Sequence, residues 1–265
     1  MPRSRFSTGG VLTLAAAAGL TLAGCHSSSP AASSTATATT SVAAAATATS
    51  AAANGPSASS AITISDGNVS YFPATVGDTW VYQISTSAGE VGTVTNKVTA
   101  VAPTAGGTLV TESDNETLAG VPISHTFEYI IHSDGSITVP VSSTDADVTV
   151  KSGQLEWPDS AQLASGQPTT DTLVFSAVES GKTVTYTESA TIKGDGTQSI
   201  TVPAGTYSAT AIGEVMSGVV EGITVKTDVD TWVVSGVGPV KEEVSTGEGS
   251  YDLTITQVLK SFTKG

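Results

Sequence analysis

Apolar and polar residues alternate with a period of two along residues 62–265, whereas a helix would repeat every 3.6 residues. In residues 182–193, Val184, Tyr186 and Ile192 share one face, and threonines occupy the other. Residues 251–262 repeat the pattern, and threonine and valine, which favour strands, are frequent throughout. No stretch after residue 61 keeps a helical apolar stripe for three turns. The pattern predicts an all-β domain over residues 62–265.

Turn residues separate the alternating runs. The turn signals are Ala105-Gly106-Gly107, Ser133-Asp134-Gly135, Gly194-Asp195-Gly196 and Gly247-Glu248-Gly249. Glycine and aspartate at such places are typical of hairpin ends. Residues 154–167 are the best place for a short helix or loop, with Pro158 in its first turn. We expect about ten to twelve strands.

Short connections between strands favour antiparallel neighbours. We therefore expect a single antiparallel, strongly curved sheet, either a half-barrel or an open barrel. The alternative is a β-sandwich of two face-packed sheets.

Three short motifs resemble a class of exported, β-rich bacterial lipoproteins, the TapB-like type. They are Tyr71-Phe72-Pro73 with Val76-Gly77-Asp78-Thr79-Trp80-Val81-Tyr82, then Val202-Pro203-Ala204-Gly205-Thr206-Tyr207, then Thr231-Trp232 with Gly236-Val237-Gly238-Pro239-Val240-Lys241. The resemblance implies a half-barrel similar in outline to lipoprotein-localisation factors, and it implies no particular substrate. Val233-Val234-Ser235 departs from the class pattern after the tryptophan.

The N-terminus carries an export pattern. Arg3 and Arg5 precede an apolar run over residues 11–22 that is too short to span a bilayer with ease. Leu22-Ala23-Gly24-Cys25 resembles the lipobox of bacterial lipoproteins. The resemblance implies that residues 1–24 are a signal peptide and that Cys25 is lipidated. We expect the protein to be anchored to a cell membrane or outer envelope, facing away from the cytoplasm.

Residues 25–61 form the predicted tether. After Cys25 and His26 they are almost entirely serine, alanine and threonine, which bury too little apolar surface to fold. The whole chain has 24 acidic and 10 basic residues and a net charge of −14. Loss of Arg3 and Arg5 with the signal leaves 8 basic residues and a charge of −16. This acidity argues against nucleic acid as a partner.

Three polar residues lie on otherwise apolar faces. Glu188 shares a face with Tyr186 and Ile192, and Glu242 lies between Val240 and Val244. Gln257, between Ile255 and Leu259, is a third case. A buried carboxylate without a partner is costly, so these positions indicate either local irregularities or a polar group that orients a ligand. The residues that we expect to line a cavity or the core are Trp80, Tyr82, Tyr186, Glu188, Trp232 and Glu242.

The histidines and acidic pairs of the chain do not form a catalytic or metal-binding motif. His26, His125 and His132 do not form a ligand set, since His125 and His132 are predicted to point to opposite faces of one strand. The pairs Asp145/Asp147 and Asp228/Asp230 each place two carboxylates on one strand face, which suits at most weak calcium binding. We expect no enzyme activity, no cofactor and no dedicated metal site.

The function predicted from the sequence is therefore binding. The β-domain would bind an apolar ligand such as a lipid, or an envelope protein, while the lipid on Cys25 holds it to the membrane. The alternative is a structural or adhesive surface module on a stalk, with no ligand pocket.

Replacement of Cys25 by serine tests the anchor. Without the thiol no lipid can be attached, so we expect Cys25→Ser to move from the membrane fraction to the soluble fraction, as measured by fractionation beside the wild type. Persistence of the variant in the membrane fraction would overturn the lipobox interpretation.

Overall fold

A computed structural model describes residues 70–87, 89–139, 148–179, 182–220, 223–248 and 251–265. The predicted signal peptide, Cys25 and the tether lie outside the described residues, as do Asp145 and Asp147. The elements are β1 (Thr79–Thr86), β2 (Gly89–Thr104), β3 (Gly107–Leu118), β4 (Val121–Ile131), β5 (Ile137–Val139), β6 (Val148–Ser152), β7 (Leu155–Trp157), α1 (Ser160–Ser165), β8 (Thr169–Glu179), β9 (Lys182–Val202), β10 (Gly205–Val220), β11 (Ile223–Val234), β12 (Gly238–Glu248) and β13 (Tyr251–Thr263).

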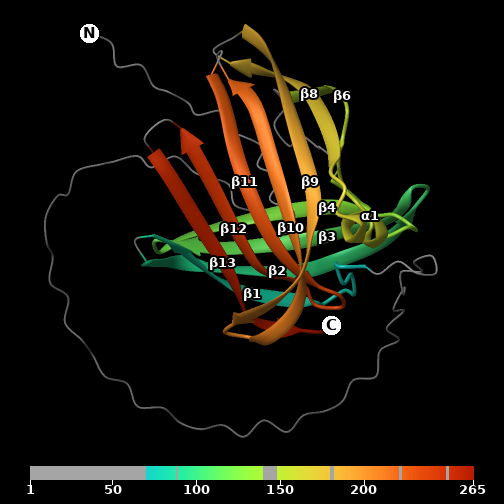
Figure 1. Cartoon of the computed structure of the whole chain (residues 1–265), viewed down its shortest axis with the longest axis vertical. Helices are drawn as coiled ribbons and strands as arrows, with labels where there is room; N and C mark the ends of the chain where they lie inside the picture. The colour runs from blue at the N-terminus through green and yellow to red at the C-terminus, as the bar shows by residue number, and fades with distance from the viewer. Residues whose placement is uncertain (1–69, 88, 140–147, 180–181, 221–222, 249–250) are drawn as a thin grey trace, which may run out of the picture.

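All the strands belong to one 13-stranded sheet with the order β6-β8-β9-β10-β11-β12-β13-β1-β2-β3-β4-β5-β7. Neighbours are antiparallel throughout. The sheet curls so that β1–β4 run across behind β9–β13 (Figure 1). It is open, with β6 and β7 at its edges. The predicted fold, one strongly curved antiparallel sheet, is confirmed, and a sandwich of two separate sheets is wrong.

Period-two alternation decides which side chains face the interior. In β1, Trp80, Tyr82 and Ile84 are buried, while the residues between them are partly exposed. β9 follows the same rule, with Tyr186, Ala190 and Ile192 buried among threonines. Because the sheet is curled, the apolar faces of both halves meet in one continuous core.

The pairing of β1 with β13 joins the first and last strands of the domain. Trp80 lies opposite Phe262 in this ladder, and their rings stack with centroids 5.3 Å apart. The Trp80 indole donates a hydrogen bond to the Val237 carbonyl. Nearby, the buried Asp78 carboxylate accepts the Gly265 N–H at 2.9 Å. These contacts fix both ends of the described domain at one seam.

The helix lies inside the predicted segment, but its start differs from the prediction. Asp159 is the N-cap, and its Oδ1 accepts the Gln162 N–H at 2.8 Å. Pro158 therefore lies before the cap and not in the first turn. Gly166 ends the helix in the left-handed conformation, with φ 67°.

The predicted turn at Gly194-Asp195-Gly196 is wrong. These residues continue β9, and the register against β10 shifts between Thr210 and Ile212. Gly194 is instead a place of close approach, since a Cβ built on it would overlap the Leu163 carbonyl oxygen. The absence of a side chain lets α1 pack directly on the strand.

No helix in the described part of the chain is both long enough and apolar enough to cross a membrane.

Gly194→Ala tests the packing of α1 on β9. The new methyl group must displace α1 or bend β9, so we expect the free energy of unfolding to fall by about 2 kcal/mol in urea denaturation. Gly106→Ala is the matched control, because a Cβ there has its nearest neighbour at 3.9 Å. Equal stability of the two variants would contradict the close approach.

Candidate functional site: an acidic interior

β3 contributes three acidic side chains to the interior. Glu112, Asp114 and Glu116 alternate along the strand and are each 3 % exposed or less. They follow Val110 on the same face, about 7 Å apart along the strand. Asp114 lies opposite Asn96 on β2 and opposite His125 on β4.

The other half of the sheet adds two more acids. Glu214 on β10 and Glu242 on β12 are 3 % and 2 % exposed. Glu242 lies directly opposite Gln257 on β13, which is also buried. We call Glu112, Asp114, Glu116, Glu214 and Glu242 the inner acid set.

Two tyrosines lie among these acids. The Tyr129 hydroxyl donates to Glu112 Oε1 at 2.6 Å. The Tyr82 hydroxyl donates to the Pro239 carbonyl at 3.1 Å. Burial raises the pKa of Tyr82 well above its usual value, and nearby Glu112, Glu242 and Asp114 raise it further. Tyr82 therefore lies between acids that come from both halves of the sheet.

Several oxygens of the inner acid set have no hydrogen-bond partner among the described residues. They include both carboxylate oxygens of Glu116 and Glu242, Oδ1 of Asp114 and Oε2 of Glu214. The amide oxygen of Gln257 is in the same state. Buried polar groups in native proteins are normally paired, so each of these acceptors calls for an explanation.

Burial raises the pKa of these carboxyl groups, because the charged form loses its hydration. The pKa is raised to about 7 for Glu112, Asp114, Glu116 and Glu188, and to about 8 for Glu214 and Glu242. Repulsion from Glu214 raises the pKa of Glu242 further. The Trp157 side chain, beside Glu214, lowers the pKa of Glu214 and so partly offsets the effect of burial. These groups thus titrate near neutral pH.

The described lysines lie elsewhere. Each is exposed except Lys241, which is partly exposed on the outer face. Lys241 pairs with Glu243 at 2.9 Å and lies 4.3 Å from the ring centroid of Trp232. Among the described residues, the inner acid set therefore has no lysine to balance its charge.

The predicted cavity or core residues do not share one environment. Trp80, Tyr82, Tyr186 and Glu242 are buried on the inner face. Glu188 is on the same face but half-buried, with its Cγ close to Gly218. Trp232 is on the outer face, because Thr231 and Val233 beside it point inward. Its indole donates to Gln198 Oε1 at 3.0 Å.

Glu242, Glu188 and Gln257 were predicted from the sequence. Four further interior acids were not, namely Glu112, Asp114, Glu116 and Glu214. Residues 111–117 are polar at every position, so alternation cannot reveal which face is buried. Glu214 lies two residues from both Ile212 and Met216 and therefore shares a strand face with them, which is the pattern that could have indicated its burial.

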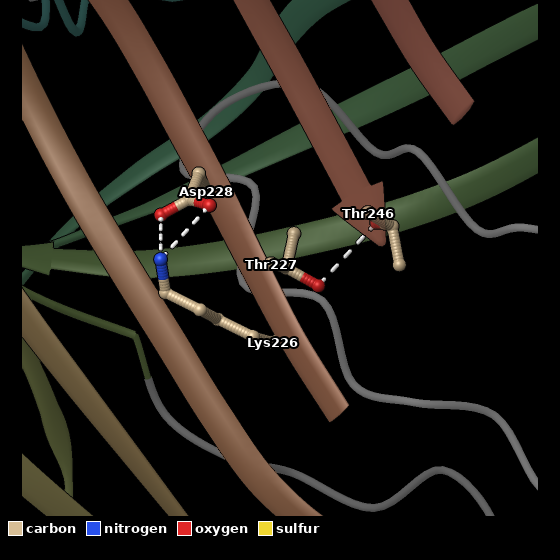
Figure 2. Close-up of polar contacts among 4 residues, drawn as sticks. All are labelled: Lys226, Thr227, Asp228 and Thr246. Atoms are coloured by element: carbon tan, nitrogen blue, oxygen red, sulfur yellow. Dashed lines mark hydrogen bonds and ion pairs between the residues drawn. The ribbon is translucent and has the colours of Figure 1, made fainter. Parts of the chain in front are cut away.

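The predicted calcium pair on β11 lies outside the core. Asp228 is on the outer face, where Lys226 Nζ contacts its Oδ1 at 2.8 Å (Figure 2). Thr227, on the opposite face, reaches Thr246 of β12 at 3.4 Å. Among the described residues, no three His, Cys, Asp or Glu side chains gather as a metal site would require.

His132 has a local role. It follows β4, with Nδ1 against the Gly106 carbonyl and Nε2 2.7 Å from Thr138 Oγ1. The prediction that His125 and His132 share one strand is therefore wrong, because β4 ends at Ile131.

Comparisons with known proteins give a family and a fold. A model of the DUF3108-like family matches residues 75–254. One similar crystal structure comes from Bacteroides fragilis and is described as an exported protein with a YmcC-like fold. It is 19 % identical in sequence, with a TM-score of 0.54, and the alignment covers 74 % of this chain and 100 % of the Bacteroides chain. A lipoprotein structure from Parabacteroides distasonis is 16 % identical with a TM-score of 0.55, covering 75 % and 100 %.

These identities establish a shared fold and nothing finer. A search of curated proteins gave no match. The resemblance to TapB-like lipoproteins stays a prediction.

The raised pKa values predict an unusual dependence of stability on pH. Between about pH 4.5 and pH 8 the folded chain holds protons on these carboxyl groups that the unfolded chain has released. Their contribution to stability is complete below about pH 4.5 and is lost as pH rises through 7 to 8. We expect the melting temperature, followed by circular dichroism, to be roughly 5–10 °C lower at about pH 8.5 than at about pH 5.5.

Two variants test whether the interior acids cause this dependence of the melting temperature on pH. Glu214→Gln combined with Glu242→Gln removes two titrating groups and should flatten the profile. Glu243→Gln, on the outer face of the same strand, should keep the wild-type slope. A melting temperature that rises over this pH range would show that the interior acids do not govern it.

Proposed function

The chain belongs to the DUF3108-like family, and we propose that it is an exported, lipid-anchored protein whose curled sheet binds an amphiphilic ligand. The lipid on Cys25 would hold the domain at the membrane, and the interior would receive the ligand. The role is binding and not catalysis.

One observation carries the proposal. Glu242 and Gln257 lie opposite each other in the interior, and their oxygens have no partner among the described residues. Their neighbours along the same strands, Val240, Val244 and Ile255, are buried hydrophobic residues. A polar pair within an apolar wall suits a ligand that has an apolar body and a polar end.

Export has independent support. The N-terminal pattern predicts it, and the similar structures from Bacteroides fragilis and Parabacteroides distasonis are described as an exported protein and a lipoprotein. The acidic charge suits a soluble domain held away from anionic lipid.

The alternative, a structural or adhesive module, is favoured by one part of the interior. Phe72 packs edge-on against Trp157 with ring centroids 5.4 Å apart, and Tyr129 lies 6.0 Å from Phe72. Such a cluster fills its space with rings. However, packing alone does not account for unpaired acceptors elsewhere in the same core, because apolar residues there would avoid the desolvation cost.

Purification of the native protein in mild detergent, followed by extraction and mass analysis, tests the proposal. We expect an amphiphile in roughly stoichiometric amount. In Glu242→Leu the polar contact is lost, so we expect a stable protein that retains much less of it. Glu243→Leu, on the outer face, is the matched control.

Wild-type protein that is empty under conditions that preserve its fold would count against ligand binding and favour the module. Equal retention by Glu242→Leu and the wild type would mean that the polar pair does not contact the ligand.

A further inference from the structure

The unmet hydrogen-bonding groups of the interior are nearly all of one kind. Apart from the Trp157 indole N–H, the buried side-chain atoms that lack a partner among the described residues are oxygens. Gln257 shows that this is not only a matter of acidic charge, since its neutral amide also lacks a donor for its oxygen. What complements such a lining is a group rich in N–H or O–H donors.

Charge favours a cationic donor. The inner acid set comes from three strands, β3, β10 and β12, and the described lysines lie on the outside. Hydrogen bonds in which one partner is ionised are roughly twice as strong as neutral ones. A cation would therefore gain more from these oxygens than a sugar or an alcohol.

The arrangement suits an organic cation. Glu242 faces Gln257, and in the sheet order β1, which carries Tyr82, lies between their strands and β3, which carries Asp114. Three unpaired oxygens, both of Glu242 and that of Gln257, thus lie opposite each other on adjacent strands, beside the strand that carries Tyr82. A tyrosine ring beside carboxylates also suits an ammonium group, which is attracted to aromatic faces.

We propose that the oxygens of Glu242 and Gln257 bind a primary ammonium head group of an amphiphilic ligand. This inference rests on the proposed function and names the chemical class of the head group. Each ammonium N–H donates to one of the unpaired oxygens, and the positive charge balances the buried carboxylates. Where a carboxyl group is protonated before binding, its proton passes to solvent as the ammonium enters.

A series of ten-carbon amphiphiles tests this on the purified full-length protein. Decylamine, decyltrimethylammonium, decanol and decanoate share one apolar chain and differ in the head group. Titration calorimetry below their critical micelle concentrations measures each affinity. We expect decylamine to bind at least tenfold more tightly than decanol or decanoate, and more tightly than decyltrimethylammonium, which has no N–H donor.

Variants locate the effect. Glu242→Gln keeps the shape of the side chain and removes its charge, so we expect at least a tenfold loss of decylamine affinity with decanol unchanged. Glu214→Gln should have a smaller effect, because β10 is two strands away from β12. Glu243→Gln should match the wild type, and melting curves check that every variant is folded.

The possible failures are distinguishable. Equal binding of decanol and decylamine would overturn the ammonium site and leave the amphiphile proposal standing. Equal binding of decyltrimethylammonium and decylamine would overturn the hydrogen-bonded head group in favour of charge alone. Binding of none of the four would count against both proposals. Calcium chloride alone, if it binds with the same dependence on Glu242, would replace the organic cation with a metal ion.

Discussion

The pairing of β1 with β13 is the constraint on which the rest of the structure depends. It joins the strands at the two ends of the folded domain and so makes one sheet from two runs of hairpins. Its side chains reach beyond the ladder: Trp80 stacks on Phe262 and bonds to Val237, and Asp78 holds Gly265. Because the first strand has neighbours on both sides, the sheet curls around a shared interior and does not divide into two layers.

That interior combines apolar packing with buried acidic groups, which normally oppose each other. It buries large apolar and aromatic side chains, and it also buries the five residues of the inner acid set, in addition to Asp78 at the seam. Burying a carboxylate without a partner costs several kcal/mol, so the groups respond by holding protons, which is why their pKa values rise to about 7 or 8. A fold stabilised by packing alone would gain from hydrophobic residues at these positions. The proposed ammonium site would give the unpaired oxygens of Glu242 and Gln257 hydrogen-bond donors.

The motifs that carry the resemblance to exported lipoproteins have structural roles here. Phe72 fills the aromatic cluster, and Pro73 and Trp80 pack against Gly238, where a side chain would approach both closely. Tyr82 bonds to Pro239 in the same region. These motifs maintain the seam of the sheet, so they identify the fold without identifying what the fold binds.

The sequence alone determined the strands, because period-two alternation is a local property that each strand carries by itself. The choice of one curved sheet over a sandwich depended on the pairing of β1 with β13. The sequence also indicated Glu242 and Gln257, since a polar residue between apolar neighbours on one strand face can be recognised without a structure. It did not reveal Glu112, Asp114 and Glu116, because β3 is polar on both faces and only its neighbours in the sheet decide which face is buried. Gly194 lies in a sequence typical of a turn, but in the structure it is a strand residue on which α1 packs. Tertiary structure decided these cases, since burial depends on which strand lies opposite, and the local sequence does not specify that.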